Sequence, residues 1–302
     1  MFDTTHFISV RDDVRLAYCD SGGSPPHVLL MLHGLFDHKG TWRTLVEHLP
    51  HIRCIAPDLV GHGQSGRPAL ANLAPAQRYA PSMQADYIEA FIEAMELDSI
   101  VLCGSSLGGG IALRLWLEHP GIRRRTRAIA LMAAAGYRQP LPGHVRQMGG
   151  WLGSLLKYPP VHYLIRQTGL LDRATRRAVE RCFYDASAVP DALVSEAIEA
   201  LKVPETFYAY QLAARNVIPP DIDVLSERLA EIDVPTLIVW GRDDRVVSPL
   251  AALRFAEDIP DSQVHFFARC GHAPYIEHAR ETAQLLHPFF QRHTDGSSCA
   301  NT

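Results

Sequence analysis

The chain has 302 residues, 47% of them hydrophobic, and a net charge of −4. This apolar content excludes a disordered chain, and 29 basic against 33 acidic residues argue against a nucleic-acid partner, which favours an excess of Lys and Arg. The length suits one large α/β core with an insertion. We expect no secretory signal, because Met1–Val10 contains no basic region followed by an apolar region. We expect no membrane-spanning helix, because no apolar run approaches about 18 residues.

Short apolar runs alternate with helical patterns along most of the chain. This alternation predicts a mostly parallel sheet that is covered by helices on both faces. A segment at Arg15–Cys19 is predicted to join an N-terminal hairpin at the sheet edge. The predicted strands are Val28–Leu32, Arg53–Ala56, Ser99–Cys103, Arg127–Met132, Thr236–Trp240 and Gln263–Phe267. The predicted helices between them are Thr41–Leu49, Ser82–Leu97 and Leu107–Glu118.

The alternation stops between Tyr137 and Asp233, where the sequence shows helical patterns and no convincing strand. These patterns are Asp172–Tyr184, Asp191–Lys202 and Glu205–Ala214. We therefore predict that residues 138–232 form a helical lid, here called the lid segment, inserted into a core made of residues 1–137 and 233–293. Residues 294–302 are polar and are predicted to be a disordered tail. The aromatic residues of the lid segment could line an apolar pocket or pack the lid on itself: Trp151, Tyr158, Tyr163, Phe183, Tyr184, Phe207, Tyr208 and Tyr210.

The motif Gly104-Ser105-Ser106-Leu107-Gly108 matches G-x-S-x-G and lies between a predicted strand and a predicted helix. In that context the serine sits on a strained turn, where small neighbours avoid backbone clashes. Ser106 is the predicted nucleophile; Ser105 is the alternative, but only Ser106 has glycine two residues away on both sides. The free N–H groups at the helix start predict that the amide of Leu107 stabilises an oxyanion.

A serine nucleophile needs a base and an orienting acid elsewhere in the chain. The expected order is serine, acid, histidine. His272 follows the last predicted strand and Asp244 follows the preceding one, with Asp243 as the rival acid.

The loop after the first buried strand, His33-Gly34-Leu35-Phe36, is predicted to supply the second oxyanion donor. That donor would be the amide of Leu35. His33 is interpreted as a brace for this loop in preference to a base, and His62 is given a structural place near the site.

Together these motifs resemble the α/β-hydrolase superfamily, in its lidded serine esterase and C–C hydrolase branch. The resemblance rests on His33-Gly34, the run Asp58–Ser65, the Ser106 motif, Gly241–Asp244 and Gly271-His272. It implies an α/β-hydrolase fold with a lid and a Ser106–His272–Asp244 triad. In similar proteins the acid is the fourth residue of a G-x-x-D turn, which is Asp244.

Several residues of this chain differ from those of related enzymes, and these differences reduce the number of reactions that the resemblance implies. Dehalogenases and epoxide hydrolases of this fold carry Asp at the nucleophile position. Meta-cleavage-product hydrolases usually carry tryptophans where this chain has Ala273 and Ile276. Hydrolysis of carboxylic esters with apolar acyl or aryl groups is therefore the main hypothesis, with C–C hydrolysis or thioester hydrolysis as alternatives. A receptor for small ligands, without fast catalysis, is the alternative of another class.

Three other patterns in the sequence do not predict a site. Gly61–Gly66 spells G-x-G-x-x-G, but Arg67-Pro68 does not open a helix, so a dinucleotide site is not predicted. The 15 histidines show no metal-ligand spacing, and neither a metal nor a cofactor is expected. Six cysteines without a C-x-x-C pair favour buried thiols and a cytoplasmic location. The expected partner is a small-molecule ester, and the oligomeric state is left open.

Overall fold

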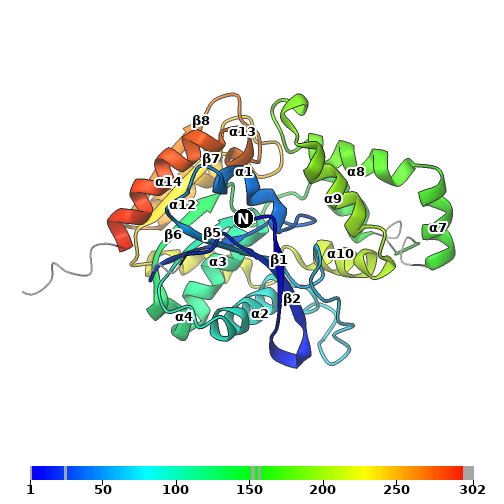
Figure 1. Ribbon diagram of the computed structural model, residues 1–302, viewed down its shortest axis with the longest axis horizontal. Coiled ribbons are helices and arrows are strands. Elements are labelled where there is room, and N and C mark those ends of the chain that lie inside the picture. Colours follow the sequence, from blue (N-terminus) through cyan, green and yellow to red (C-terminus); the bar gives the residue numbers. More distant parts are fainter. Residues whose placement is uncertain (1, 24–25, 151–153, 156–157, 295–302) are drawn as a thin grey trace, which may run out of the picture.

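The structure is a computed structural model that describes residues 2–23, 26–150, 154–155 and 158–294. Its centre is an eight-stranded sheet with the order β1-β2-β4-β3-β5-β6-β7-β8 (Figure 1). The strands are β1 (Thr5–Ser9), β2 (Arg15–Asp20), β3 (Val28–Leu32), β4 (Arg53–Pro57), β5 (Ile100–Ser105), β6 (Thr126–Met132), β7 (Thr236–Gly241) and β8 (Ser262–Phe267). The six strands from β3 to β8 pair in parallel. The antiparallel pairing of β1 with β2 confirms the predicted edge hairpin.

The order of the strands places a topological switch point between β3 and β5, because the chain runs outward from β3 to β4 and returns to place β5 on the other side. In open α/β sheets, ligands bind outside the carboxyl ends of the strands at such a point. The loops that follow β3 and β5 are those of Gly34 and Ser106. The fold therefore brings the two predicted halves of the site together.

The helices cover both faces of the sheet. They are α1 (Arg43–Val46), α2 (Pro81–Ala94), α3 (Leu107–Glu118), α4 (Pro120–Arg125), α5 (Gly143–Gly149), α7 (Pro159–Gln167), α8 (Leu170–Glu180), α9 (Asp191–Ala200), α10 (Pro204–Asn216), α11 (Ile222–Glu227), α12 (Leu250–Asp258), α13 (Pro274–Glu277) and α14 (Ala279–Thr294). Helices α2, α3 and α12 bury their apolar side chains in one core cluster, and α1 and α14 bury theirs in the other.

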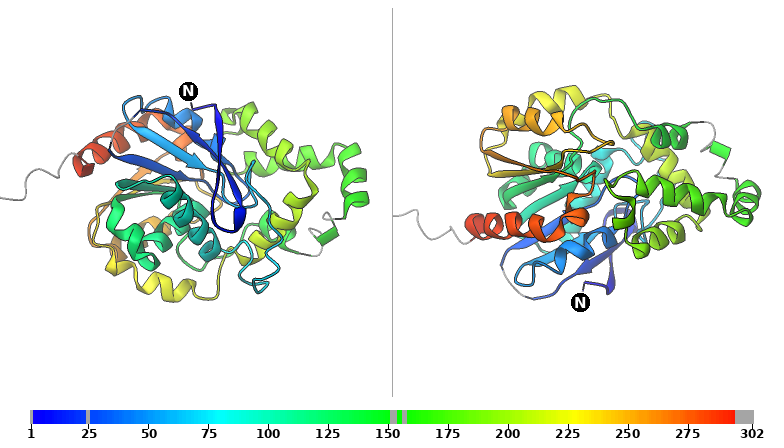
Figure 2. Two further views of the ribbon diagram at one scale, coloured as in Figure 1. Left: turned by 60° about the horizontal axis from the view of Figure 1, so that its bottom comes forward. Right: turned by 90° about the horizontal axis from the view of Figure 1, so that it is seen from above.

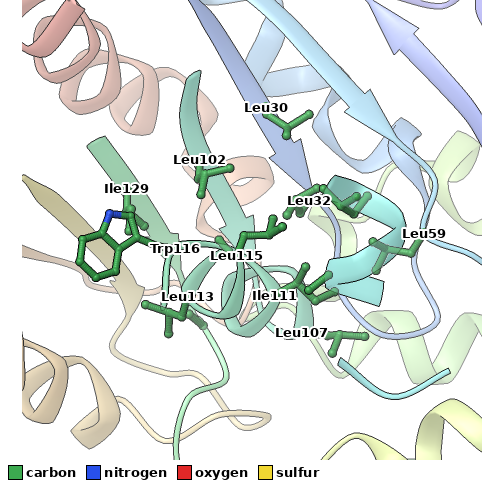
Figure 3. Packing of buried hydrophobic residues seen from close by; sticks show 14 of the residues in the cluster. Leu30, Leu32, Leu59, Leu102, Leu107, Ile111, Leu113, Leu115, Trp116 and Ile129 are labelled. Atoms are coloured by element: carbon green, nitrogen blue, oxygen red, sulfur yellow. The ribbon is translucent and has the colours of Figure 1, made fainter. Parts of the chain in front are cut away.

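Alternation along the strands builds these two cores. Leu30 and Leu102 belong to the cluster that contains α3 (Figure 3), whereas their neighbours Leu29 and Val101 belong to the cluster on the opposite face. Successive side chains of a strand point to opposite faces, so a strand covered on both faces has to be apolar at every position. All five residues of β3 are buried, which explains why the run Val28–Leu32 was readable from sequence.

The lid segment contains α5 and α7 to α11, and its described residues include no strand. Helices α7 and α8 extend away from the sheet at one end of the molecule (Figure 2). Other helices of the segment pack on the core: Leu193 and Val194 of α9 are buried in one of the two core clusters that contain sheet residues, and Ile222 and Leu225 of α11 are buried in the other. The predicted tail lies, apart from Thr294, outside the described residues.

One predicted helix is shorter than expected. Instead of a helix over Thr41–Leu49, the chain forms a 3-10 turn at Lys39–Trp42 and a single helical turn at α1. The amides of His48 and Leu49 bond to carbonyls three residues back, which tightens the chain before Pro50. Among the described residues, no helix is both long and apolar enough to cross a membrane.

Candidate active site

Ser106 lies on the sharp turn between β5 and α3, with φ 51° and ψ −119°. A non-glycine residue at positive φ is strained by about 1–3 kcal/mol and persists only where its surroundings enforce it. The surroundings here are tight: a Cβ on Gly104 would lie 2.3 Å from the Gly108 carbonyl oxygen, and one on Gly108 would lie 2.0 Å from that of Leu32. Glycine at both positions is therefore a packing requirement of the turn.

His272 and Asp244 are joined by a hydrogen bond of 2.8 Å between Nδ1 and Oδ2. Both side chains are buried. The other carboxylate oxygen of Asp244 accepts the amides of Val246 and Val247 at 2.7 and 3.0 Å, which fixes the carboxylate in the turn after β7. The predicted rival, Asp243, makes no such bond to the imidazole.

The loop after β3 lies directly against Ser106. A Cβ on Gly34 would be 3.3 Å from the Ser106 Cβ and 3.8 Å from its Oγ. His33 supports this loop from behind: its Nδ1–H donates to the Gly34 carbonyl at 2.8 Å, and its Nε2 accepts the Leu59 amide at 2.9 Å. Burial lowers the pKa of His33 to about 3, so the ring is neutral and is held between two backbone groups.

A second clamp holds the same loop from the side of β4. Asp58 is fully buried and accepts the Lys39 amide at 2.6 Å, the Lys39 Nζ at 3.0 Å and the Gln64 amide at 2.8 Å. Lys39 Nζ also donates to the Gln64 side chain at 2.8 Å. None of these partners lies within five residues of Asp58 in sequence, and none was predicted. The network ties the loop of Leu35 to the turn after β4.

Lys39→Met is expected to lower the free energy of unfolding by about 3 kcal/mol, because it leaves a buried carboxylate without its cation. Urea unfolding followed by tryptophan fluorescence measures this loss. In the double variant Lys39→Met/Asp58→Asn the loss should be smaller than the sum of the two single losses. Additive losses would contradict the coupling of the two side chains.

Ser106, His272, Leu35 and Leu107 line one cavity of about 360 Å³ beyond the carboxyl ends of the strands. Most of its wall is apolar and comes from the lid segment, including Leu141, Val145, Met148, Leu171, Leu193 and Ile218. No lysine or arginine is among the described residues that line it. No hydrogen bond joins Ser106 to His272 among the described residues.

Asp37 is a cavity-lining residue that the sequence analysis missed. Its carboxylate accepts the amide of His38 at 2.9 Å and interacts with the Thr41 hydroxyl, and burial raises its pKa. In the described chain it has no cation within ion-pair distance. Its place three residues after Gly34 was the available signal, because a side chain that close to the predicted oxyanion loop has to lie near the site.

Glu277 is the second missed residue, and it joins the His272 loop to the lid segment. Its Oε1 accepts the Gly271 amide and its Oε2 accepts the Tyr184 amide, both at 2.7 Å. The His272 amide itself donates to the Cys182 carbonyl at 2.6 Å. The His272 loop and the chain that follows α8 therefore share direct hydrogen bonds, although they are about ninety residues apart.

The aromatic residues of the lid segment do not share one role. Phe183 and Tyr210 are buried and line the cavity, and Phe207 is buried against His162. In contrast, Tyr158 and Tyr163 are not among the residues that line the cavity, and they are 54% and 62% exposed. Tyr184 is exposed and Tyr208 is half-buried; Trp151 lies outside the described residues.

Comparison with known proteins gives one family match and several relatives of similar length. The family described as the alpha/beta hydrolase fold matches residues 27–279. The chain is 29% identical to the 2-hydroxymuconate semialdehyde hydrolase of Pseudomonas sp. (strain CF600), covering 91% of this chain and 90% of that protein. It is 27% identical to a monoacylglycerol lipase of Bos taurus, covering 92% and 80%. A meta-cleavage product hydrolase of Pseudomonas fluorescens IP01 superposes with a TM-score of 0.74 at 26% identity, covering 95% and 97%.

Proposed function

The chain belongs to the family of the alpha/beta hydrolase fold, and from that premise we propose that it is a serine hydrolase with Ser106, His272 and Asp244 as its triad. The observation that carries this proposal is the 2.8 Å bond between His272 and Asp244 in the cavity that Ser106 also lines. Asp244 would hold the imidazole with Nε2 free to accept a proton, which is the tautomer that a general base requires.

In the proposed mechanism His272 removes the Ser106 proton while Oγ attacks a carbonyl carbon of the substrate. The amides of Leu35 and Leu107 would donate to the oxyanion, where each donor is worth about 3 kcal/mol. Collapse of the intermediate breaks the bond to the leaving group, which takes its proton from His272. Water then attacks the acyl-enzyme by the same route and releases the acid.

For the bond that is broken, C–C hydrolysis is the first candidate and replaces ester hydrolysis, the main hypothesis from sequence. Its support is that both the hydrolase of strain CF600 and the superposed solved structure are named for such substrates. A hydroxymuconate semialdehyde contains no ester, so its hydrolase has to break a C–C bond. In that reaction the electron pair of the broken bond enters the conjugated enol system of the leaving group, and the net change consumes one water.

Ester hydrolysis is retained as the second candidate because of a specific feature of the cavity. Its described wall contains no lysine or arginine and does contain the carboxylate of Asp37. A substrate with a free carboxylate would meet a charge of its own sign, whereas a neutral ester or neutral ketone would meet a mostly apolar wall. The similarity to a monoacylglycerol lipase adds to this candidate, and the helices of the lid segment would exclude water in both cases.

One substrate panel separates the two candidates. It contains a 2-hydroxy-6-oxo-dienoate, the methyl ester of that compound, short and long p-nitrophenyl esters, and a monoacylglycerol. The C–C proposal expects loss of the dienoate chromophore, with the methyl ester turned over faster than the free acid. Turnover of the esters alone would leave ester hydrolysis as the function. Inactivity on the whole panel, with no labelling by a fluorophosphonate, would overturn the serine-hydrolase proposal.

Asp37→Asn is expected to raise kcat/KM for the free dienoate about fivefold or more. Two like charges a few ångströms apart repel by at least about 1 kcal/mol, and the substitution removes one of them. The rate on the neutral methyl ester should not change, which controls for damage to the site. The gain should shrink as the pH falls through the raised pKa of Asp37, because protonation neutralises the wild-type side chain as well. An equal effect on acid and ester would contradict the electrostatic explanation.

A further inference from the structure

The outer end of the lid segment presents an unusual concentration of exposed apolar side chains. Eleven large hydrophobic residues are exposed in the described part of the chain, and five of them fall between positions 155 and 170. These five, here called the lid tip, are Leu155, Tyr158, Tyr163, Leu164 and Leu170, with exposed fractions of 41, 54, 62, 65 and 59%. They lie around α7, at the opposite end of the long axis of the molecule from α14 (Figure 1).

The lid tip is held in place from its inner side. His162 of α7 is 3% exposed, and its Nε2 hydrogen-bonds the Leu201 carbonyl at 2.9 Å. Its ring packs on Phe207 with 5.0 Å between the ring centroids. The next two residues, Tyr163 and Leu164, then face outward. The exposure of Tyr163 and Leu164 is thus fixed by an anchored helix.

The chain around the neighbouring helix α8 carries an excess of positive charge, and this charge indicates the kind of partner. Residues 158–181 contain five arginines against Asp172 and Glu180, a net charge of +3 in a chain whose net charge is −4. Three of them, Arg173, Arg176 and Arg177, are exposed on α8 and are here called the arginine face. Within the described residues only Arg176 has an ion-pair partner, Asp191 at 3.0 Å. The arginine face therefore offers positive charge beside the apolar tip.

We propose that the lid tip and the arginine face dock on the surface of an anionic lipid bilayer. Exposed leucine and tyrosine side chains next to arginines match a bilayer surface, where apolar groups enter the headgroup boundary and basic groups meet anionic lipids. A second copy of the chain fits less well, because a two-fold contact through the same patch would set the arginine faces near each other. This inference concerns a surface outside the cavity and does not depend on which bond the enzyme breaks.

Helix α8 connects this surface to the cavity. Its outer side carries the arginine face, and its inner side contributes Leu171, Ala174, Thr175 and Ala178 to the cavity wall. A docked molecule would therefore hold one helix between the bilayer and the cavity, so that an apolar substrate dissolved in the bilayer would have a short path to the site.

Co-sedimentation with phospholipid vesicles tests the proposal. The wild-type chain is expected to bind vesicles that contain phosphatidylglycerol, and added NaCl should weaken this binding. Leu164→Ser/Leu170→Ser should lower the partition coefficient about tenfold or more, because the transfer of one leucine side chain alone is worth about that factor. Arg173→Gln/Arg177→Gln should lower it about fivefold per arginine on anionic vesicles and leave binding to pure phosphatidylcholine unchanged.

Matched control variants change residues on α12 and α14, away from the lid tip. Leu250→Ser/Leu253→Ser changes two leucines that are 71% and 48% exposed on α12, and Arg280→Gln/Arg292→Gln changes two exposed arginines on α14. Both should bind like wild type, and circular dichroism establishes that every variant is folded. If the leucine variant fails to fold, the arginine pair carries the test. Absent wild-type binding, equal binding by all variants, or a dimer that only the leucine variant dissociates would each overturn the proposal.

Discussion

Ser106→Ala is expected to lower kcat by a factor on the order of 10⁴ to 10⁶, whichever carbonyl substrate the panel identifies. Removal of the nucleophile of a serine triad leaves only the contribution of the oxyanion hole and of substrate binding. The measurement is steady-state hydrolysis, combined with fluorophosphonate labelling and mass spectrometry of the labelled peptide. Labelling should disappear in this variant.

Ser105→Ala is the matched control for that loss. The Ser105 side chain is 1% exposed and interacts with the Tyr275 hydroxyl, not with His272 or Asp244, so its removal should change kcat little. A label that persists in Ser106→Ala and disappears in Ser105→Ala would reassign the nucleophile. Loss of activity in both variants without loss of labelling would point to damaged packing of the turn.

The same assay, applied to the Asn variants of the two neighbouring residues Asp243 and Asp244, tests which of them is the acid of the proposed triad. Asp244→Asn should lower kcat by about 10⁴, because an asparagine at this position favours the tautomer of His272 that cannot act as the proposed base. Asp243→Asn should have little effect, since only Asp244 bonds to His272. Equal losses in the two variants would leave the assignment of the acid without support.

The sequence predicts well those parts of the fold whose physical constraints act between residues close together in the chain. A strand that is buried on both faces is apolar at each position, and this makes Val28–Leu32 and Thr236–Trp240 visible without any knowledge of their neighbours. The turn of Ser106 is visible for a related reason, because its strain demands glycine two residues away on each side. In both cases the physical constraint acts within a few residues, so it leaves a local pattern.

The features that the sequence does not reveal depend on partners that are distant along the chain. The clamp of Asp58 on Lys39 spans 19 residues, and Glu277 reaches Tyr184 across 93 residues. No periodicity encodes such pairs. The exposure of Tyr163 depends on tertiary structure in the same way, because α7 lies at the end of the molecule and this side chain faces outward from it.

Mild acid is expected to destabilise this chain by about 4 kcal/mol between pH 7 and pH 5 through two buried histidines. Burial lowers the pKa values of His33 and His62 to about 3, whereas both would titrate near 6.5 in the unfolded chain. Between these values the unfolded state binds more protons than the folded state, so the free energy of unfolding falls as the pH falls. Each group contributes a slope of about 1.4 kcal/mol per pH unit well below pH 6.5.

The surroundings of the two rings explain why protonation of either one is unfavourable in the folded chain. His33 accepts the Leu59 amide on Nε2, so protonation there would set two N–H groups against each other. In His62, Nδ1–H donates to the Val60 carbonyl at 3.1 Å, and Nε2 is buried without a partner. The two ring centroids are 5.4 Å apart, so charges on both rings would also repel. Protonation at low pH is therefore expected to destabilise the loops that hold Gly34 beside Ser106.

His62→Phe isolates one of the two contributions. Phenylalanine keeps the aromatic packing against His33 and Tyr210, and the Val60 carbonyl retains the bond from the Gln84 side chain at 2.8 Å. Urea unfolding at a series of pH values should show the slope of the free energy reduced by about 1.4 kcal/mol per pH unit below pH 6, so that the variant, although weaker at pH 7, loses less on acidification. A slope unchanged from wild type would show that His62 is not neutral and buried in the folded chain, and that carboxylates elsewhere govern the acid transition.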